Sequence, residues 1–583
     1  MGRIMGRRFS LCLVVSGSLL ASGLATTLTT ASAGAATGRT PGSAAGNPFC
    51  KNLGVKYQAS AGAQAFCFGA QRSRSGAARA PRPAAPAVST NVNAANLAED
   101  VSQSGVRAYG QSETSVAATG PYVVEAWNDA TSFVSPCPSP SSKEEGTGLG
   151  FSANGGKSFT DLGGLPNSNC AANIYEGDPS VIAYTAGGSR FFYISSLFDS
   201  PTGLGGSFIA MDACKVRGTG TAATLRCGQP VILASSSLCT TIPNVGQACN
   251  FLDKDFLSVD PARGRLYATF TEFNIKTGAS QVELSACDLG NRAGGAGPAG
   301  GTPAAPVCTN NRLQKPPYLV VQRPDPNGCE YEGAYPAVDT ATGGVYAGYE
   351  YNVETNLINP ACFNVVTSEV LVRIPRSCLT LTARAACTGP AARTAVPVVS
   401  MDAAFIPGYN RFPMNDFPRV AVSGPAGTVT MVWNDARHHP LGDILLQSFT
   451  LGSLVRVQRA PVVLNPAADV SNFLPALRVA NGRGNLDVSW YSRTKANSAI
   501  TGVTAVIGVS PKTTARPGSH ATITSATSDW NSISSDIVPN FGDYTDNVLV
   551  TTGTAPYVGG TLYVAWSDGR LGLPQPFEAH LTG

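Results

Sequence analysis

From about Ser112 onward, short apolar runs with alternating or β-branched residues are separated by turns rich in Gly, Pro, Asn and Asp. This pattern is typical of β-strands, and no segment shows the spacing of a convincing amphipathic helix. The 63 glycines and 41 prolines suit a chain with many turns. The sequence therefore predicts an all-β protein.

One kind of unit occurs seven times along the chain. Each unit begins with an acidic or polar residue and a strand, crosses a Gly-containing turn, and enters a second strand that ends in an aromatic or polar residue. The units begin at Ser112, Asp178, Asp253, Glu332, Asp416, Asn472 and Gly542. A third strand follows most of them and a fourth often does, which predicts a single β-propeller of seven four-stranded antiparallel blades. A sandwich or two stacked domains is the competing all-β interpretation, but sheet closure explains a seven-fold repeat more directly.

The two ends of the repeat region predict how the ring closes. The last unit stops after its third strand, EAHLT, close to Gly583. A segment near Val88 to Val92 is available to supply the missing outer strand. Four tryptophans recur at one position of the repeat, so they are expected to pack between blades rather than to form a sugar-stacking surface. They are Trp127, Trp433, Trp490 and Trp566.

The N-terminus predicts export. Three arginines precede an apolar stretch from Leu11 to about Leu24, and Ala31-Ser32-Ala33 has the small-x-small pattern of a cleavage site. Serines and glycines interrupt the apolar stretch, which argues against a transmembrane anchor. Residues 1–33 are therefore interpreted as a signal peptide of a secreted, extracellular protein. The Arg7-Arg8 pair also resembles a twin-arginine signal, so the export route stays open.

The chain after the signal divides into two parts. Residues 34–94 are rich in Ala, Gly, Ser and Pro and are predicted to form a low-complexity tether with a small Cys50–Cys67 loop. Residues 95–583 are assigned to the propeller. The 37 acidic and 41 basic residues nearly cancel, which argues against nucleic acid or an anionic membrane surface as a partner. No membrane span in the mature chain and a monomer are expected.

Cysteine usage fits an oxidising compartment. Cys12 is lost with the signal, and an even number of cysteines remains. No CxxC occurs and the four histidines are mostly scattered, so disulfides are favoured over a zinc site. The simplest pairing joins neighbours along the chain: Cys50–Cys67, Cys137–Cys170, Cys214–Cys227, Cys239–Cys249, Cys287–Cys308, Cys329–Cys362 and Cys378–Cys387.

A turn motif in the first unit carries a family resemblance. The sequence FSANGGKSF contains Ser152-x-Asn154-x-Gly156-x-Ser158-Phe159. This segment resembles the Asp-box, the hairpin turn of the sialidase-like (BNR-repeat) propellers, with Asn in place of the usual Asp. The resemblance implies the propeller fold, but the turn is a structural element far from the catalytic site in that family. In sialidases an Arg-Ile-Pro motif lies near the start of the catalytic domain. Here Arg373-Ile374-Pro375 lies in the middle of the chain, so it is interpreted as part of an outer strand rather than as that motif.

Strand direction predicts which residues reach the channel. If each first strand begins at the top of the channel, the second strand returns there and the Asp-box turn lies at the bottom. Carboxylates at the first-strand starts and arginines after the second strands would then converge, with two tyrosines nearby. The candidates are Glu113, Asp178, Asp255, Glu332, Asp416, Asp543, Arg437, Arg493, Arg570, Tyr335 and Tyr544.

Three hypotheses of function follow from this ring of charges. The first is a sialidase-like glycoside hydrolase acting on extracellular glycans, with Asp178 and Glu332 as the preferred catalytic carboxylates. The second is a non-catalytic propeller that binds a glycan or a cell-surface protein. The third is a scaffold whose channel holds calcium through oxygen ligands, although no cofactor is required by the sequence. Each charged residue also has a purely structural interpretation, since strand-start acids cap backbone groups and Trp-x-Asp with a following Arg can join blades.

Overall fold

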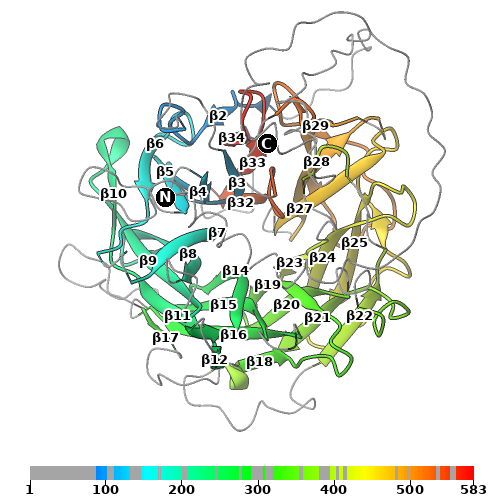
Figure 1. Ribbon diagram of the computed structural model, residues 1–583. Helices are drawn as coiled ribbons and strands as arrows, with labels where there is room; N and C mark the ends of the chain where they lie inside the picture. Colours follow the sequence, from blue (N-terminus) through cyan, green and yellow to red (C-terminus); the bar gives the residue numbers. More distant parts are fainter. Residues whose placement is uncertain are drawn as a thin grey trace, which may run out of the picture.

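The computed structural model describes residues 87–100, 110–130, 146–168, 170, 172–199, 206–242, 246–274, 277, 279–289, 306–308, 319–352, 359–379, 394–401, 406–410, 416–479, 484–495, 498–533, 539–551 and 560–582. Seven antiparallel sheets stand around a central axis (Figure 1). This arrangement confirms the predicted seven-bladed β-propeller. The signal peptide, the tether up to residue 86 and the Cys50–Cys67 loop lie outside the described residues.

The first three blades follow the chain in order. Blade 1 contains β3 (Gln111–Thr119), β4 (Tyr122–Asp129), β5 (Thr147–Ser152) and β6 (Thr160–Gly164). Blade 2 contains β7 (Ile174–Ala186), β8 (Ser189–Asp199), β9 (Phe208–Arg217), β10 (Thr224–Cys227) and β11 (Val231–Ser235). Blade 3 contains β14 (Phe251–Asp260), β15 (Arg265–Phe273), β16 (Ser280–Asp288), β17 (Val307–Cys308) and β18 (Leu319–Gln322). A hairpin of β12 (Cys239–Ile242) and β13 (Gly246–Cys249) joins blades 2 and 3.

The next three blades repeat the arrangement. Blade 4 contains β19 (Tyr331–Asp339), β20 (Gly344–Tyr351), β21 (Ser368–Ile374) and β22 (Thr394–Val399). Blade 5 contains β23 (Arg419–Ser423), β24 (Thr428–Asp435), β25 (Asp443–Thr450) and β26 (Val462–Val463). Blade 6 contains β27 (Ser471–Val479), β28 (Leu486–Arg493), β29 (Ile500–Val509), β30 (Ala521–Thr522) and β31 (Ser528–Asp529). Arg373 and Ile374 lie in β21, the third strand of blade 4, as the sequence predicts.

Blade 7 combines both ends of the repeat region. It contains β32 (Asp546–Thr551), β33 (Gly560–Asp568) and β34 (Gln575–Thr582). Its outer edge is supplied by β1 (Ala87–Val88) and β2 (Val92–Asn93), which pair with β34 at Val88↔Leu581 and Val92↔Glu578. The predicted closing segment is thus confirmed.

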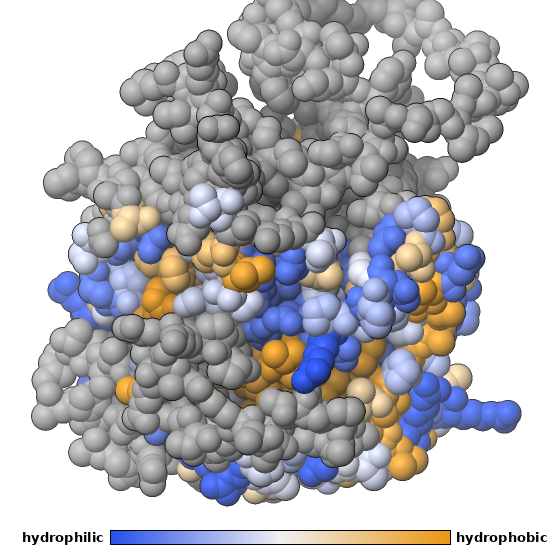
Figure 2. Space-filling model, turned by 60° about the horizontal axis from the view of Figure 1, so that its bottom comes forward, coloured by the Kyte–Doolittle hydropathy of each residue, from blue (hydrophilic) through white to orange (hydrophobic). Residues whose placement is uncertain are grey.

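The hydrophobic core is divided among the seven interfaces between neighbouring blades. Seven clusters of buried side chains are found in the described part of the chain, and each draws on at least two adjacent blades. Trp433, Trp490 and Trp566 each lie in the cluster that their blade shares with the preceding one, and all are at most 1 % exposed. The predicted packing role of these tryptophans is confirmed. Hydrophilic and hydrophobic side chains interleave on the described outer surface (Figure 2), an ordinary mixture for a protein in water.

Four of the predicted disulfides are formed among the described residues: Cys214–Cys227, Cys239–Cys249, Cys287–Cys308 and Cys329–Cys362. Three of these join residues that face each other on paired strands. Each closes a loop of 10 to 33 residues, for which chain entropy gives about 2–4 kcal/mol of stabilisation. Cys170 and Cys378 are also disulfide-bonded, while their predicted partners Cys137 and Cys387 lie outside the described residues.

The Asp-box turn between β5 and β6 has the hydrogen bonds that its sequence predicts. The Ser152 hydroxyl accepts the Gly156 backbone N–H at 3.0 Å and donates to Asn154 Oδ1 at 2.9 Å. Asn154 accepts the Ser158 N–H at 3.1 Å and donates its amide to the Ser158 hydroxyl at 2.8 Å. Asparagine therefore serves this turn as well as aspartate would. The seven blades and this turn fit the resemblance to sialidase-like propellers.

The Asp-box generates a prediction at Gly156. This residue has φ of +77°, and an added Cβ would lie 2.5 Å from the Glu578 Oε2 of the neighbouring blade. We expect Gly156→Ala to lower the free energy of unfolding by about 1–3 kcal/mol, because the left-handed backbone and the buried carboxyl both oppose a methyl group. Thermal and denaturant unfolding would measure the loss. Asn154→Asp, the matched control, should change stability little, and an unchanged Gly156→Ala variant would contradict the prediction.

Candidate functional site

The innermost strands of blades 1, 2 and 3 each contain a bulge with a left-handed residue. Glu113, Asp178 and Lys254 have φ of 54°, 55° and 50°, and the register of their strands shifts at the same places. Gly333 and Leu474 occupy the equivalent bulges of blades 4 and 6. A left-handed non-glycine residue is unfavourable by about 1–2 kcal/mol, and a bulge redirects its side chain. Three strained and charged residues in equivalent positions therefore mark this end of the channel as a candidate functional site.

The three bulge residues meet around one ammonium group. Lys254 Nζ lies 2.8 Å from Asp178 Oδ2, 3.0 Å from Asp543 Oδ2 and 3.4 Å from Glu113 Oε1. Side-chain exposure is 5 % for Lys254, 12 % for Asp178 and 0 % for Glu113 and Asp543. We call these four residues the Lys254 cluster. It joins blades 1, 2 and 3 to the segment that leads into blade 7, and Asp178 is its most exposed member.

Hydrogen bonds fix the carboxyl groups of the cluster. Asn128, at the end of β4, donates its amide to Glu113 Oε2 at 2.9 Å and accepts the Asp178 N–H at 2.6 Å. The Asp543 N–H donates to Glu113 Oε1 at 3.0 Å, and the Tyr409 hydroxyl donates to Asp543 Oδ1 at 2.5 Å. Second-strand ends and first-strand starts thus meet at one end of the channel, as strand direction predicts.

The cluster shifts the pKa values of two of its carboxyl groups in opposite directions. Burial raises the pKa of Glu113 well above its ordinary value, and the charge of Asp178 raises it further. Burial alone would also raise the pKa of Asp178, but Lys254 and hydrogen bonds from Glu113 and Asp253 hold it well below its ordinary value. The surrounding carboxylates raise the pKa of Lys254 despite its burial, so it stays charged. The two carboxyl groups are hydrogen-bonded to each other, and their pKa values are shifted in opposite directions, so Asp178 ionises more readily than Glu113.

A second layer of charge and aromatic rings fills the channel below the cluster. The Arg419 guanidinium lies 4.4, 4.7 and 5.5 Å from the ring centres of Phe256, Tyr335 and Tyr544, which come from three different blades. Arg478 donates to the Tyr335 hydroxyl at 2.6 Å and to Asp546 at 2.7 Å. The Tyr544 hydroxyl donates to the Pro179 carbonyl at 3.0 Å. The channel is thus a packed core at this level, where cation–π contacts replace an open pore.

The structure brings together only some of the predicted channel residues. Glu113, Asp178 and Asp543 meet in the Lys254 cluster, and Tyr335 and Tyr544 lie in the aromatic layer. Glu332, a preferred catalytic candidate, is 2 % exposed, and its charge adds to the rise in the pKa of Asp253 that burial mainly causes. In the Lys254 cluster Asp178 lies with Glu113, and the catalytic role of Glu332 stays a prediction.

Two other predicted carboxylates hold neighbouring strands together. Asp255 is 1 % exposed and accepts a hydrogen bond from the Ser195 hydroxyl of β8, and burial raises its pKa to about 8. Asp416 is fully buried and accepts a hydrogen bond from the Asn434 amide. These contacts give both carboxylates a structural role, and their part in a channel site stays a prediction.

Arg437 and Arg570 were expected at the channel and instead bind toward the rim. Arg437 forms a fork with Asp435 at 2.5–2.7 Å and donates to the carbonyl of Val399 in the outer strand of blade 4. Arg570 repeats the fork with Asp568 at 2.6–2.9 Å and reaches blade 6, where it donates to the Ser525 hydroxyl at 2.9 Å and the Ala526 carbonyl at 3.2 Å; it also donates to Asn91 between β1 and β2 of its own blade. The same aspartates accept the indole N–H of Trp433 and Trp566. These Trp-x-Asp-x-Arg segments join blades, in agreement with the structural interpretation of this pattern in the sequence.

Arg493 is likewise displaced from the channel. Its side chain is 1 % exposed, donates from Nε to Thr501 at 2.9 Å and lies 5.0 Å from the Phe473 ring centre. Burial lowers its pKa to about 9. Arg493 is therefore part of the interior of blade 6.

Metal binding has limited support from these residues. Among the described residues, no three His, Cys, Asp or Glu side chains are grouped in a way that could hold a metal ion. The carboxylates that do converge surround the Lys254 ammonium, which occupies the position a cation would need.

Over the same part of the chain, no helix has the length and apolar character needed to cross a membrane.

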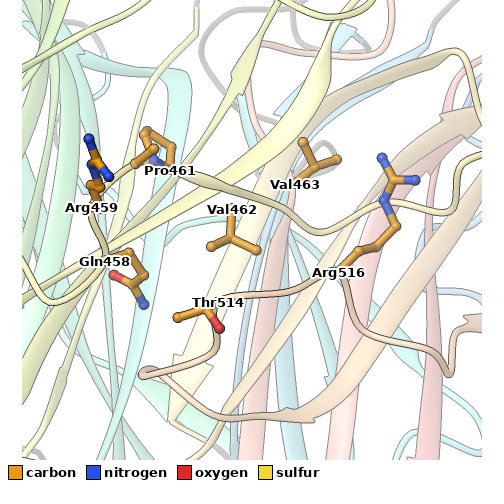
Figure 3. Close-up of a pocket in the computed structure, with 8 residues that line it drawn as sticks. Gln458, Arg459, Pro461, Val462, Val463, Thr514 and Arg516 are labelled. Carbon is orange, nitrogen blue, oxygen red and sulfur yellow. The ribbon is translucent and has the colours of Figure 1, made fainter.

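A separate cavity of about 420 Å³ lies between blades 5 and 6, away from the Lys254 cluster (Figure 3). It is lined by Gln458, Arg459, Pro461, Val462, Thr514 and Arg516, among others. We call it the interblade groove. Sequence reasoning missed it, because its two walls belong to different repeats.

Comparisons with known proteins identify similar propellers at low similarity. No protein family matches the sequence, and no curated protein matches it. "Hadza microbial sialidase Hz136" is 12 % identical at a TM-score of 0.34, over 69 % of this chain and 64 % of that one. An N-acetylgalactosamine deacetylase from F. plautii is 10 % identical at a TM-score of 0.33, over 60 % and 94 %. A neuraminidase-like protein from A/bat/Guatemala/164/2009 is 8 % identical at a TM-score of 0.33, over 69 % and 87 %. TM-scores this low do not indicate a shared activity.

Removing the ammonium group tests the Lys254 cluster. We expect Lys254→Met to destabilise the protein at neutral pH by about 3–5 kcal/mol, because buried carboxylates lose their counter-ion. With its pKa lowered, the Asp178 carboxylate stabilises the wild type above its unfolded pKa, and this stability is lost as pH falls. Without Lys254 the carboxyl pKa values rise, so the variant should gain stability relative to wild type as pH falls.

Melting temperatures of both proteins between about pH 3 and about pH 8 would measure this difference. Lys512→Met removes an exposed lysine and is the matched control. A Lys254→Met variant as stable as wild type at neutral pH would show that the ion pairs of Lys254 do not contribute to the free energy of unfolding.

Proposed function

We propose that this protein is exported and acts on extracellular glycans, as a sialidase-like glycoside hydrolase working at the channel end where Asp178 lies. One observation carries the proposal: Asp178 is the most exposed carboxylate of a strained cluster and is hydrogen-bonded to Glu113, whose pKa is shifted in the opposite direction. Strained residues and opposite pKa shifts are enriched at active sites. The disulfides are consistent with an extracellular protein.

The chemistry requires one group that gives a proton and another that receives one. Hydrolysis breaks the glycosidic C–O bond, adds the hydroxyl of water to the anomeric carbon and places a proton on the leaving oxygen. In the proposal, Asp178 contacts the substrate and passes to the leaving oxygen a proton that it takes from Glu113 through their hydrogen bond. The proton that the attacking water releases returns to Glu113 through Asp178, so that both carboxyl groups regain their starting state. Glu113 is fully buried and is therefore a positioning residue that acts through Asp178.

A screen of the purified protein against aryl glycosides, including sialosides, tests the proposal. We expect Asp178→Asn to reduce turnover by about 10²–10⁴-fold and Glu113→Gln to shift the pH profile, because each removes part of the proton pathway. Asp487→Asn is the control, since Asp487 is a buried carboxyl of β28 that accepts the Gly508 N–H at 2.8 Å. Full activity in a folded Asp178→Asn variant would refute the catalytic role. Running the screen with and without calcium tests the calcium hypothesis in the same experiment.

A second candidate function is glycan binding without catalysis. It is favoured by the burial of the cluster, in which Lys254 contacts three carboxyl groups within 3.4 Å and little surface is left for a substrate. Absence of turnover on every substrate, with retained binding on a glycan array, would select this function.

A further inference from the structure

The interblade groove is built from two segments that belong to neighbouring blades. One wall is formed by residues 459–463, which lead into and include β26 of blade 5. The other wall is formed by Thr514 and Arg516, in the connection between β29 and β30 of blade 6. The cavity of about 420 Å³ falls in the range of small-molecule sites, about 300–1,000 Å³.

Hydrogen bonds tie the two walls together on both sides of the groove. The buried Gln458 donates to the carbonyls of Pro511 at 2.7 Å and Thr513 at 3.1 Å, and its own Oε1 accepts the Ser448 N–H at 2.9 Å. Beyond the other end of the 459–463 wall, His520 Nε2 donates to the Leu464 carbonyl at 2.8 Å. The groove is therefore held open by the fold, and a ligand would bind it without first ordering a loop.

The groove carries positive charge without a matching acid. Arg459 and Arg516 are both exposed, and neither forms an ion pair in the described part of the chain. No acidic residue is among the lining residues. Figure 3 shows the two arginines on opposite sides of the groove, with Val462 and Thr514 between them. This differs from Arg437 and Arg570, whose guanidinium groups are occupied by aspartates and carbonyls.

We propose that the interblade groove binds a carboxylate-bearing oligosaccharide, with Arg459 and Arg516 each taking an anionic sugar. The planar guanidinium fork matches a carboxylate and forms paired hydrogen bonds with it. Pro461 and Val462 provide an apolar surface for the C–H face of a sugar ring, and the Thr514 hydroxyl can hydrogen-bond to a sugar hydroxyl. The choice of a glycan rests on the proposed function, while the anionic character rests on the groove alone.

Calorimetric titration with an oligogalacturonate tests this site, beside its methyl ester, which has the same sugar rings without the charges. We expect the acid to bind, and Arg459→Ala or Arg516→Ala to weaken binding by about tenfold each, as the loss of one charge-assisted contact predicts. Lys512→Ala is the matched control, because Lys512 is an exposed cation in the same connection outside the groove. The methyl ester should bind at least about tenfold more weakly than the acid.

Three outcomes would overturn the proposal: equal binding of acid and ester, equal weakening by Lys512→Ala, or no binding of the acid. The titration is made with the Asp178→Asn variant, so that hydrolysis cannot remove the probe. Failure of the groove and failure of the proposed function are then distinguishable, because turnover depends on Asp178 and groove binding depends on the two arginines.

Discussion

Closure of the ring is the constraint on which the rest of this structure depends. No blade buries its own faces, since every apolar cluster of the described core lies between two blades. The pairing of β1 and β2 with β34 therefore secures all seven interfaces at once, because an open ring would expose two apolar faces to water. The Trp-x-Asp-x-Arg segments reinforce the same interfaces toward the rim. Arg570 even reaches Asn91, so the closing segment is tied by a side chain as well as by its backbone.

Closure also creates the charged centre of the molecule. The Lys254 cluster joins residues up to 430 positions apart in the chain, as the contact between the Asp543 N–H and Glu113 shows. Such a cluster is costly to bury, and its left-handed bulges add backbone strain. Strain of this kind persists only where the surrounding structure determines it, and here the neighbouring blades supply the hydrogen bonds that hold it. A packed aromatic layer around Arg419 fills the channel beside the cluster, so we expect a ligand of the Lys254 cluster to approach from the end at which Asp178 lies.

The repeat pattern predicts the fold well because a propeller is made of local units. Strand order, the closing segment, the Asp-box turn and four neighbour disulfides all depend on residues near each other in the sequence or on the repeat itself. The candidate site was predicted only in part, because it depends on contacts across the ring. Glu113, Asp178 and Asp543 could be expected from strand direction, but Lys254 could not, since its direction follows from a left-handed bulge that lysine rarely adopts. The signal was present in the DKD sequence, a lone cation among strand-start acids.

The arginines show why residue type alone does not locate function. Arg437, Arg493 and Arg570 share a position near the ends of second strands, where a converging ring of positive charge would be expected. Arg437 and Arg570 donate hydrogen bonds to aspartates two residues earlier in the chain. Arg493 is buried against the Phe473 ring. Arg459 and Arg516 lie outside the repeat. No acidic residue lines the interblade groove, so neither arginine has a carboxylate partner among the lining residues. Among the described arginines, those at the repeated second-strand ends are therefore held inside or between blades, whereas Arg459 and Arg516, which lie outside the repeat, form no ion pair there.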